Sequence, residues 1–227
     1  MRRSRAITVA ALIGLGAAGV AGWGTAAYLA FTRSPNLEPG AREAIAANQI
    51  LGGDSPIGQA LERRHSGGQD DFGGAAPDQA TEQALAWAAT GKNREGTGFV
   101  VPLAMHAEPY VSVYLADAVG SRQFSWRTNE FTTVSEGDAR AEFVTQGFAK
   151  KAPLLMILVM DTSKIPGGEE AFGHMAVGAM TQNVYLLADE AGVEARYVAS
   201  IDAEAITRVL TLDKTQVPVG AIVLAQR

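Results

Sequence analysis

The longest uninterrupted apolar stretch of the chain lies at its N-terminus. Residues 6–32 contain no charged side chain, and Arg2, Arg3 and Arg5 precede them. A stretch of this length can cross a hydrocarbon core of about 30 Å, which needs roughly 20 helical residues. The preceding arginines place the N-terminus in the cytoplasm by the positive-inside rule. We therefore expect residues 1–33 to be a single-pass membrane anchor or signal segment, with the remainder on the extracytoplasmic (periplasmic) side.

Two other interpretations of this segment remain open. The small residues Thr25-Ala26-Ala27 suit cleavage of a signal peptide, although the apolar stretch exceeds the usual length of about 7–15 residues. The pair Arg2-Arg3 suits a twin-arginine export signal, although Arg5 and Ala6 stand where that signal prefers bulky apolar residues.

Three patterns predict β-strands in the rest of the chain. Residues 110–116 alternate between apolar and polar positions, which is typical of a half-buried strand. Residues 153–160 and 218–225 are apolar without alternation, so they predict strands covered on both faces. Shorter strands are expected at residues 121–126 and 198–201.

Helices are predicted where apolar residues recur at helical spacing between capping residues. The predicted segments are residues 41–51, 78–90, 138–148, 169–191 and 202–210, the last with Asp202 as N-cap. Residues 169–191 are apolar nearly all round, which indicates either a central core helix or a helix at a dimer interface. The polar, Gly-rich residues 61–77 predict a loop.

These elements predict an α+β protein with three parts. Residues 1–33 form the anchor or signal segment, residues 34–60 a linker and first helix, and residues 61–227 one domain. The chain of 227 residues is 47% hydrophobic and 19% charged, an ordinary globular composition. Its net charge of −5 argues against nucleic acid as a partner.

The cysteine and histidine content limits the chemistry further. The chain has no cysteine, which excludes disulfides and thiolate catalysis. Its histidines, His65, His106 and His174, form no HxH or HxxxH pair, so we expect no metal site.

One short segment combines groups that can bind an anion. In Arg63-Arg64-His65-Ser66, two guanidinium groups and a hydroxyl precede a Gly-rich stretch and can hold a phosphate. A solvated arginine pair without a ligand is the alternative interpretation.

Together with this segment, several other segments of the chain resemble the FMN-dependent nitroreductase family. The branch that they resemble most is that of the oxidative dehydrogenases that act in thiazole and oxazole peptide synthesis. Residues 61–66 resemble the Arg-Arg-Ser-x-Arg element that binds the flavin phosphate. Residues 86–94 resemble the "W-A-A-x-G-x-N-R" helix end. Residues 102–110 align with Pro-Ser-x-x-Asn-x-Gln-Pro-Trp, and residues 182–193 resemble "Q-N-x-x-L-x-A…G-L-G".

The resemblance implies a nitroreductase-like fold, with a central, mostly antiparallel sheet flanked by helices. It implies a homodimer with the long helix at the interface, FMN as cofactor and a small-molecule or peptide substrate. Flavin carries the hydride, so no catalytic side chain is expected. The implied cofactor-binding residues are Arg63, Arg64 and Ser66 at the phosphate, His106 and Glu108 near the ring or ribityl chain, and Ala199 and Ser200 along the isoalloxazine.

The chain departs from the family pattern at several positions. Gly67-Gly68 follow Ser66, so the second phosphate-binding arginine is missing. Leu103, His106 and Glu108 stand in place of the family's Ser, Asn and Gln. Two functions therefore remain: an exported, membrane-tethered FMN oxidoreductase, or a non-enzymatic dimeric module whose flavin site has degenerated.

Overall fold

The computed structural model describes residues 55–96 and 98–227. The predicted anchor or signal segment, the linker after it and the predicted helix at residues 41–51 lie outside these ranges and stay predictions. Within the described ranges, no helix combines the length and apolar character needed to cross a membrane.

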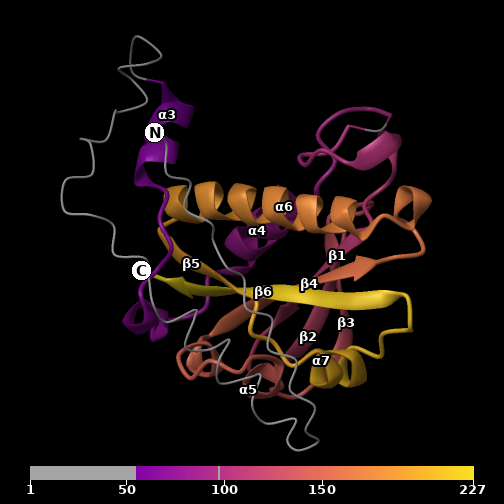
Figure 1. Ribbon diagram of the computed structural model, residues 1–227. Coiled ribbons are helices and arrows are strands. Elements are labelled where there is room, and N and C mark those ends of the chain that lie inside the picture. Colours follow the sequence, from indigo (N-terminus) through magenta and orange to yellow (C-terminus); the bar gives the residue numbers. More distant parts are fainter. Residues whose placement is uncertain (1–54, 97) are drawn as a thin grey trace, which may run out of the picture. The chain divides into compact units, whose positions relative to one another are not determined.

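A central antiparallel sheet organises the domain (Figure 1). Its six strands follow the spatial order β3-β2-β1-β4-β6-β5. The strands are β1 (Val111–Ala116), β2 (Gly120–Ser125), β3 (Glu130–Glu136), β4 (Leu154–Asp161), β5 (Val193–Val198) and β6 (Gln216–Gln226). The expected mostly antiparallel sheet is confirmed.

β4 is the most deeply buried strand of the sheet. Every residue from Leu154 to Asp161 is buried, and the strand pairs with β1 on one side and β6 on the other. Helices cover both faces, so side chains on either side of the strand avoid water, and the sequence therefore lacks alternation. The prediction of a doubly covered strand is confirmed here.

Helices cover the sheet on both faces, α4 and α6 above it and α5 and α7 below it in the view of Figure 1. The helices are α3 (Pro56–Arg63), α4 (Gln79–Thr90), α5 (Arg140–Phe143), α6 (Glu170–Glu190) and α7 (Ala203–Val209). Short 3-10 turns span Gln69–Phe72, Ala104–His106, Ala149–Lys151 and Pro166–Gly168. Each face has its own apolar core, so the domain has three layers.

Local capping fixes where the helices begin. The Asp78 carboxylate accepts a hydrogen bond from the Thr81 N–H at 2.8 Å, and Asp202 accepts one from the Ala205 N–H at 2.9 Å. Both satisfy a backbone donor that has no partner within the helix. The predicted N-cap at Asp202 is confirmed.

Two local predictions are wrong. The helix expected at residues 138–148 is only α5, because Val144 forms an isolated bridge with Ile201 and leaves the helix. The strand expected at residues 198–201 lies earlier, at β5, which ends at Val198. Beyond it, the Ser200 carbonyl accepts a hydrogen bond from the Thr145 N–H. The exposed edge strand β3 was not predicted, because its polar sequence lacks a buried face.

Candidate functional site

The Arg63–Ser66 segment leaves α3 and lies against the C-terminal end of α6. The Arg63 guanidinium donates to Asp189 at 2.8 Å and to Glu190 at 3.1 Å. Asp189 also accepts from Arg227 at 3.1 Å. The hydrogen bond from Arg63 is the largest influence on Asp189 and holds the pKa of that carboxyl below its usual 3.8. Arg63 is therefore paired with carboxylates, and a phosphate would compete with them.

Arg64 and Ser66 contact a different group, the phenol of Tyr185 on α6. The Arg64 guanidinium carbon lies 5.6 Å from the centre of the Tyr185 ring. The Ser66 hydroxyl donates to the Tyr185 oxygen at 3.3 Å, and that oxygen accepts from the Tyr197 N–H at 2.6 Å. Arg64 and Ser66 thus both contact Tyr185, Arg64 over its ring and Ser66 at its hydroxyl, and a guanidinium and a hydroxyl gathered in this way fit a phosphate.

His106 and Glu108 lie in a loop that begins near the other end of α6. Met105 and His106 both have left-handed backbone conformations, with φ of 51° and 59°. Such conformations are strained for non-glycine residues and gather at functional sites. Tyr110 fixes the loop, because its buried hydroxyl accepts from the Ala104 N–H and donates to the Phe172 carbonyl, both at 3.3 Å.

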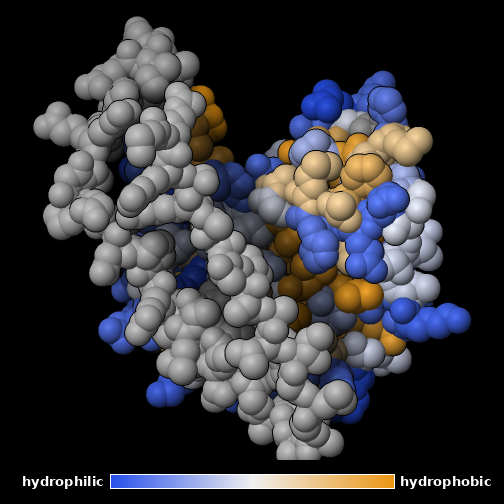
Figure 2. Space-filling model, in the orientation of Figure 1, coloured by the Kyte–Doolittle hydropathy of each residue, from blue (hydrophilic) through white to orange (hydrophobic). Residues whose placement is uncertain are grey.

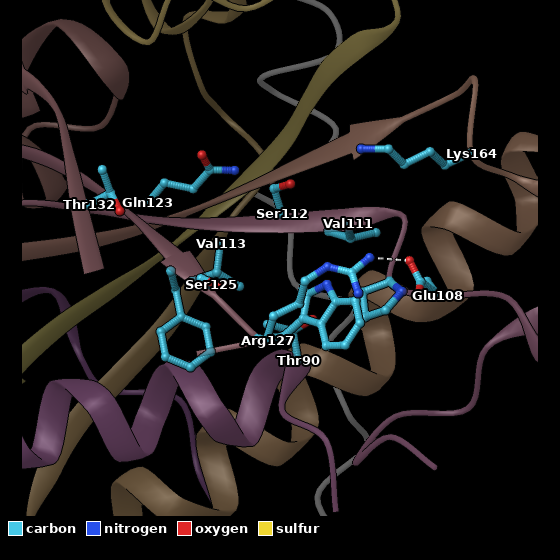
Figure 3. A pocket seen from close by; sticks show the side chains of 13 residues that line it. Thr90, Glu108, Val111, Ser112, Val113, Gln123, Ser125, Arg127, Thr132 and Lys164 are labelled. Carbon is cyan, nitrogen blue, oxygen red and sulfur yellow. Dashed lines mark hydrogen bonds and ion pairs between the residues drawn. The ribbon is translucent and has the colours of Figure 1, made fainter. Parts of the chain in front are cut away.

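Glu108 is neutralised by an arginine that the sequence did not indicate. Its carboxylate pairs with Arg127, whose guanidinium carbon lies 4.0 Å from the centre of the Trp126 ring (Figure 3). The edge of Phe99 contacts the same indole, with ring centres 5.1 Å apart. The carboxylate of Glu108, which stands in place of the family's Gln, is therefore paired with a positive charge.

Ala199 and Ser200 form a third location. Both are exposed, and the Ser200 carbonyl accepts from the Thr145 N–H at 3.0 Å. The Ser200 hydroxyl accepts from the Gln146 side chain at 3.3 Å. These contacts tie the segment to the chain after α5.

Within one chain, the predicted residues form separate groups. Tyr185 and Phe172, which anchor the first two groups, are both on α6. At a helical rise of 1.5 Å per residue, they lie about 20 Å apart along the axis. A single chain therefore brings Arg63, Arg64 and Ser66 together but separates them from the loop that carries His106 and Glu108.

The family-like motifs also contain a residue whose contacts are structural. Asn183 of α6 donates to the Ala88 and Val100 carbonyls, both at 3.1 Å, and so joins α6 to α4 and to the chain beyond it. Sequence reasoning missed two site neighbours, Tyr185 and Arg127. A phenol on an otherwise apolar helix was a signal for Tyr185, whereas nothing in the sequence paired Arg127 with Glu108.

The Nitroreductase family model matches residues 75–225. The match covers well over half of the chain, and the chain belongs to this family. The family resemblance stated from the motifs is confirmed. Membership supports a flavin-dependent oxidoreductase at the level of the family. A search of curated proteins found no match.

Solved structures share the fold. A putative nitroreductase from Ralstonia eutropha JMP134 matches with a TM-score of 0.68 and 24% identity, over 76% of this chain and 83% of that chain. A putative nitroreductase from Desulfovibrio desulfuricans, in complex with FMN, matches with a TM-score of 0.55 and 17% identity, over 76% and 87%. The E. coli microcin synthetase McbBCD complex with truncated pro-MccB17 matches with a TM-score of 0.60 and 14% identity, over 95% and 84%.

Proposed function

We propose that this protein is an FMN-dependent oxidoreductase in which Arg64 and Ser66 hold the flavin phosphate. The observation that carries the proposal is the guanidinium and hydroxyl gathered on Tyr185. Both groups donate hydrogen bonds to phosphate oxygens. FMN would supply hydride transfer, and the protein would supply binding and orientation. The assignment of Arg63 to the phosphate stays a prediction, since its guanidinium is also paired with Asp189 and Glu190.

A homodimer would complete each site. A two-fold axis perpendicular to α6 would run the two copies of the helix antiparallel. The C-terminal end of one copy, with Arg64, would then lie near the N-terminal end of the other, with the His106 loop. Apolar side chains are available for this contact: Trp87 is 38% exposed and Met175 50% exposed. Figure 2, in the orientation of Figure 1, shows hydrophobic residues, coloured pale orange and orange, on the visible surface at the level where Figure 1 draws α6.

The proposal is tested by titrating the full-length protein with FMN and, separately, with riboflavin, which lacks the phosphate. Arg64→Ala should weaken FMN binding by about tenfold to a hundredfold, the worth of a hydrogen bond to a charged group. Riboflavin affinity should not change. The matched control is Arg208→Ala, another arginine, which pairs with Glu142 at 2.7 Å. Equal losses for the two ligands would refute the phosphate assignment.

A non-enzymatic module is the second candidate. The pairing of Arg63 with two carboxylates favours it, because part of the phosphate-binding element is already engaged. The visible spectrum of the purified full-length protein separates the candidates. Flavin absorption at near-stoichiometric occupancy supports the oxidoreductase, whereas a colourless protein that fails to take up added FMN supports the module.

We also propose that residues 1–33 tether or export the domain to the extracytoplasmic side. The support is the uncharged stretch at residues 6–32 preceded by Arg2, Arg3 and Arg5. Membrane fractionation followed by protease treatment of intact cells tests this. A domain that stays in the soluble cytoplasmic fraction contradicts it.

A further inference from the structure

The adjacent arginines Arg63 and Arg64 have different partners on α6. Arg63 is paired with the carboxylates of Asp189 and Glu190, in the last turn of the helix. Arg64 is half-buried and forms no ion pair with any residue that the structure describes. Its guanidinium carbon lies 5.6 Å from the centre of the Tyr185 ring instead. Arg64 is therefore the arginine of the two that is placed to receive an anion.

The side chain of Tyr185 is fixed before it reaches these residues. Its ring packs against the apolar core on the α6 side of the sheet. Its oxygen accepts a hydrogen bond of 2.6 Å from the Tyr197 N–H on β5. The same oxygen accepts the hydrogen bond of 3.3 Å from the Ser66 hydroxyl. Core packing and a strand N–H thus hold both the ring that Arg64 contacts and the hydroxyl that Ser66 contacts.

The position of Tyr185 on α6 also decides which partner each arginine has. Tyr185 and Asp189 are four residues apart in the helix, so their side chains are neighbours on one face. A guanidinium near this face can contact either the aromatic ring or a carboxylate. Arginine is attracted to the face of an aromatic ring, and this attraction keeps Arg64 at Tyr185. Without the ring, Arg64 would be free to join Arg63 at the carboxylates, which compete with a phosphate.

We propose that Tyr185 is a positioning residue for phosphate binding: its ring orients the Arg64 guanidinium, and its hydroxyl orients the Ser66 side chain. The inference rests on the proposed assignment of Arg64 and Ser66 to the FMN phosphate. A donor that is already held in place loses less side-chain freedom when it binds, so the oriented pair binds a phosphate more tightly. Tyr185 therefore contributes to the affinity for FMN and not to the affinity for riboflavin, which lacks the phosphate.

The test compares the affinities of full-length Tyr185 variants for FMN and for riboflavin, by titration of flavin fluorescence. Tyr185→Phe keeps the ring and removes the hydroxyl, so it should weaken FMN binding by about threefold to tenfold. Tyr185→Leu removes the ring as well, and the loss should rise to about tenfold or more. Riboflavin affinity should not change in either variant. A merely structural role would weaken the binding of both flavins.

A double-mutant cycle shows whether Tyr185 acts through Ser66. In the Ser66→Ala background, the Tyr185 hydroxyl has no side chain left to orient. Tyr185→Phe should therefore cause little further loss of FMN affinity there, although it causes a clear loss in the wild type. The ring is tested in the same way, since Tyr185→Leu should add little once both Arg64→Ala and Ser66→Ala are present.

Tyr114→Phe is the matched control. Tyr114, on β1, belongs to the apolar core on the opposite face of the sheet, so the loss of its hydroxyl should leave the binding of both flavins unchanged.

The inference is overturned if Tyr185→Phe binds FMN as the wild type does, if both flavins lose affinity equally, or if the effects of Tyr185→Phe and Ser66→Ala are additive. Each of these results, together with a loss in Arg64→Ala that is selective for FMN, leaves the phosphate assignment intact. A wild-type protein that binds FMN no more tightly than riboflavin overturns both the assignment and the inference.

Discussion

β1 is paired along its whole length with β4 but along only half of it with β2. On the β4 side, the facing residues are apolar and at most 1% exposed. On the β2 side, the strands separate and neutral polar side chains line a cavity. Where β1 pairs continuously with β4, the side chains form a dry core. Where its pairing with β2 is interrupted, hydrogen-bonding side chains line the gap. The first region stabilises the fold, and the second leaves a cavity of about 290 Å³.

The largest expected effect tests the stabilising side. Leu158 of β4 is fully buried, so Leu158→Ala should lower the free energy of unfolding by about 2–5 kcal/mol. Ser112 lies on the neighbouring strand β1 but lines the cavity on its β2 side, and Ser112→Ala should change the free energy by no more than about 0.5 kcal/mol. Urea denaturation followed by circular dichroism measures both. Comparable losses would remove the distinction between the two sides of β1.

A second test examines how closely α6 packs on β4. A Cβ added at Gly173 would lie 2.0 Å from the Met160 sulfur. Gly173→Ala should therefore lower stability by about 1–3 kcal/mol. On the same helix, a Cβ at Gly178 meets no heavy atom within 4 Å. Gly178→Ala should instead raise stability by about 0.5–1 kcal/mol through helix propensity. Urea melts at two protein concentrations separate folding from assembly, and a gain at Gly173 would contradict close packing.

At the cavity on the β2 side of β1, a substitution should raise the free energy of unfolding, whereas in the core it should lower it. Thr90→Val removes a buried hydroxyl without a partner among the described residues and keeps the side-chain shape. It should raise the free energy of unfolding by about 1 kcal/mol. Thermal unfolding measures this, with Thr181→Val as the comparison at a second unpartnered hydroxyl. A loss of stability in Thr90→Val would mean that the hydroxyl has a structural partner, such as bound water.

The smallest effect concerns the charges at the end of α6, and it is present at neutral pH and lost in acid. Arg63 and Arg227 hold the pKa of Asp189 below 3.8. A depressed pKa contributes stability that is fully present above the unfolded value, declines as the pH falls below 3.8, and is lost below the folded value. Asp189→Asn should therefore be less stable than wild type at neutral pH, and the difference should shrink in acid. A constant difference across the pH series would contradict the assignment.

The sequence predicted the elements whose signal is local. Asp202 caps its helix as expected, and Asp78 caps the helix predicted to start at residue 78, because a cap depends on residues within one turn. The uninterrupted apolar run of β4 predicted burial on both faces. β3 gave no such signal, since an exposed edge strand requires neither alternation nor an apolar run. The helix expected at residues 138–148 was shortened by a bridge between Val144 and Ile201, which the sequence could not indicate.

The candidate site also has a part that local sequence predicted and a part that depends on long-range contacts. The motif at residues 61–66 predicted Arg64 and Ser66 as phosphate-binding residues from their neighbours in the sequence, and that role stays a prediction. Their contact with Tyr185 connects positions more than 100 residues apart, since Ser66 and Tyr185 are separated by 119. The pairing of Arg127 with Glu108 likewise depends on how β2 and the loop before β1 approach each other.

By itself, the sequence determined the class of fold and the family, and it predicted a segment that binds a phosphate. These follow from composition, periodicity and motifs, which are local properties of the chain. Only the tertiary structure decided that Arg63 pairs with Asp189, that the predicted site residues gather near opposite ends of α6, and that the pairing of β1 with β2 ends at Tyr114 and Gln123. These features arise from strand register and long-range packing, which adjacent residues do not encode.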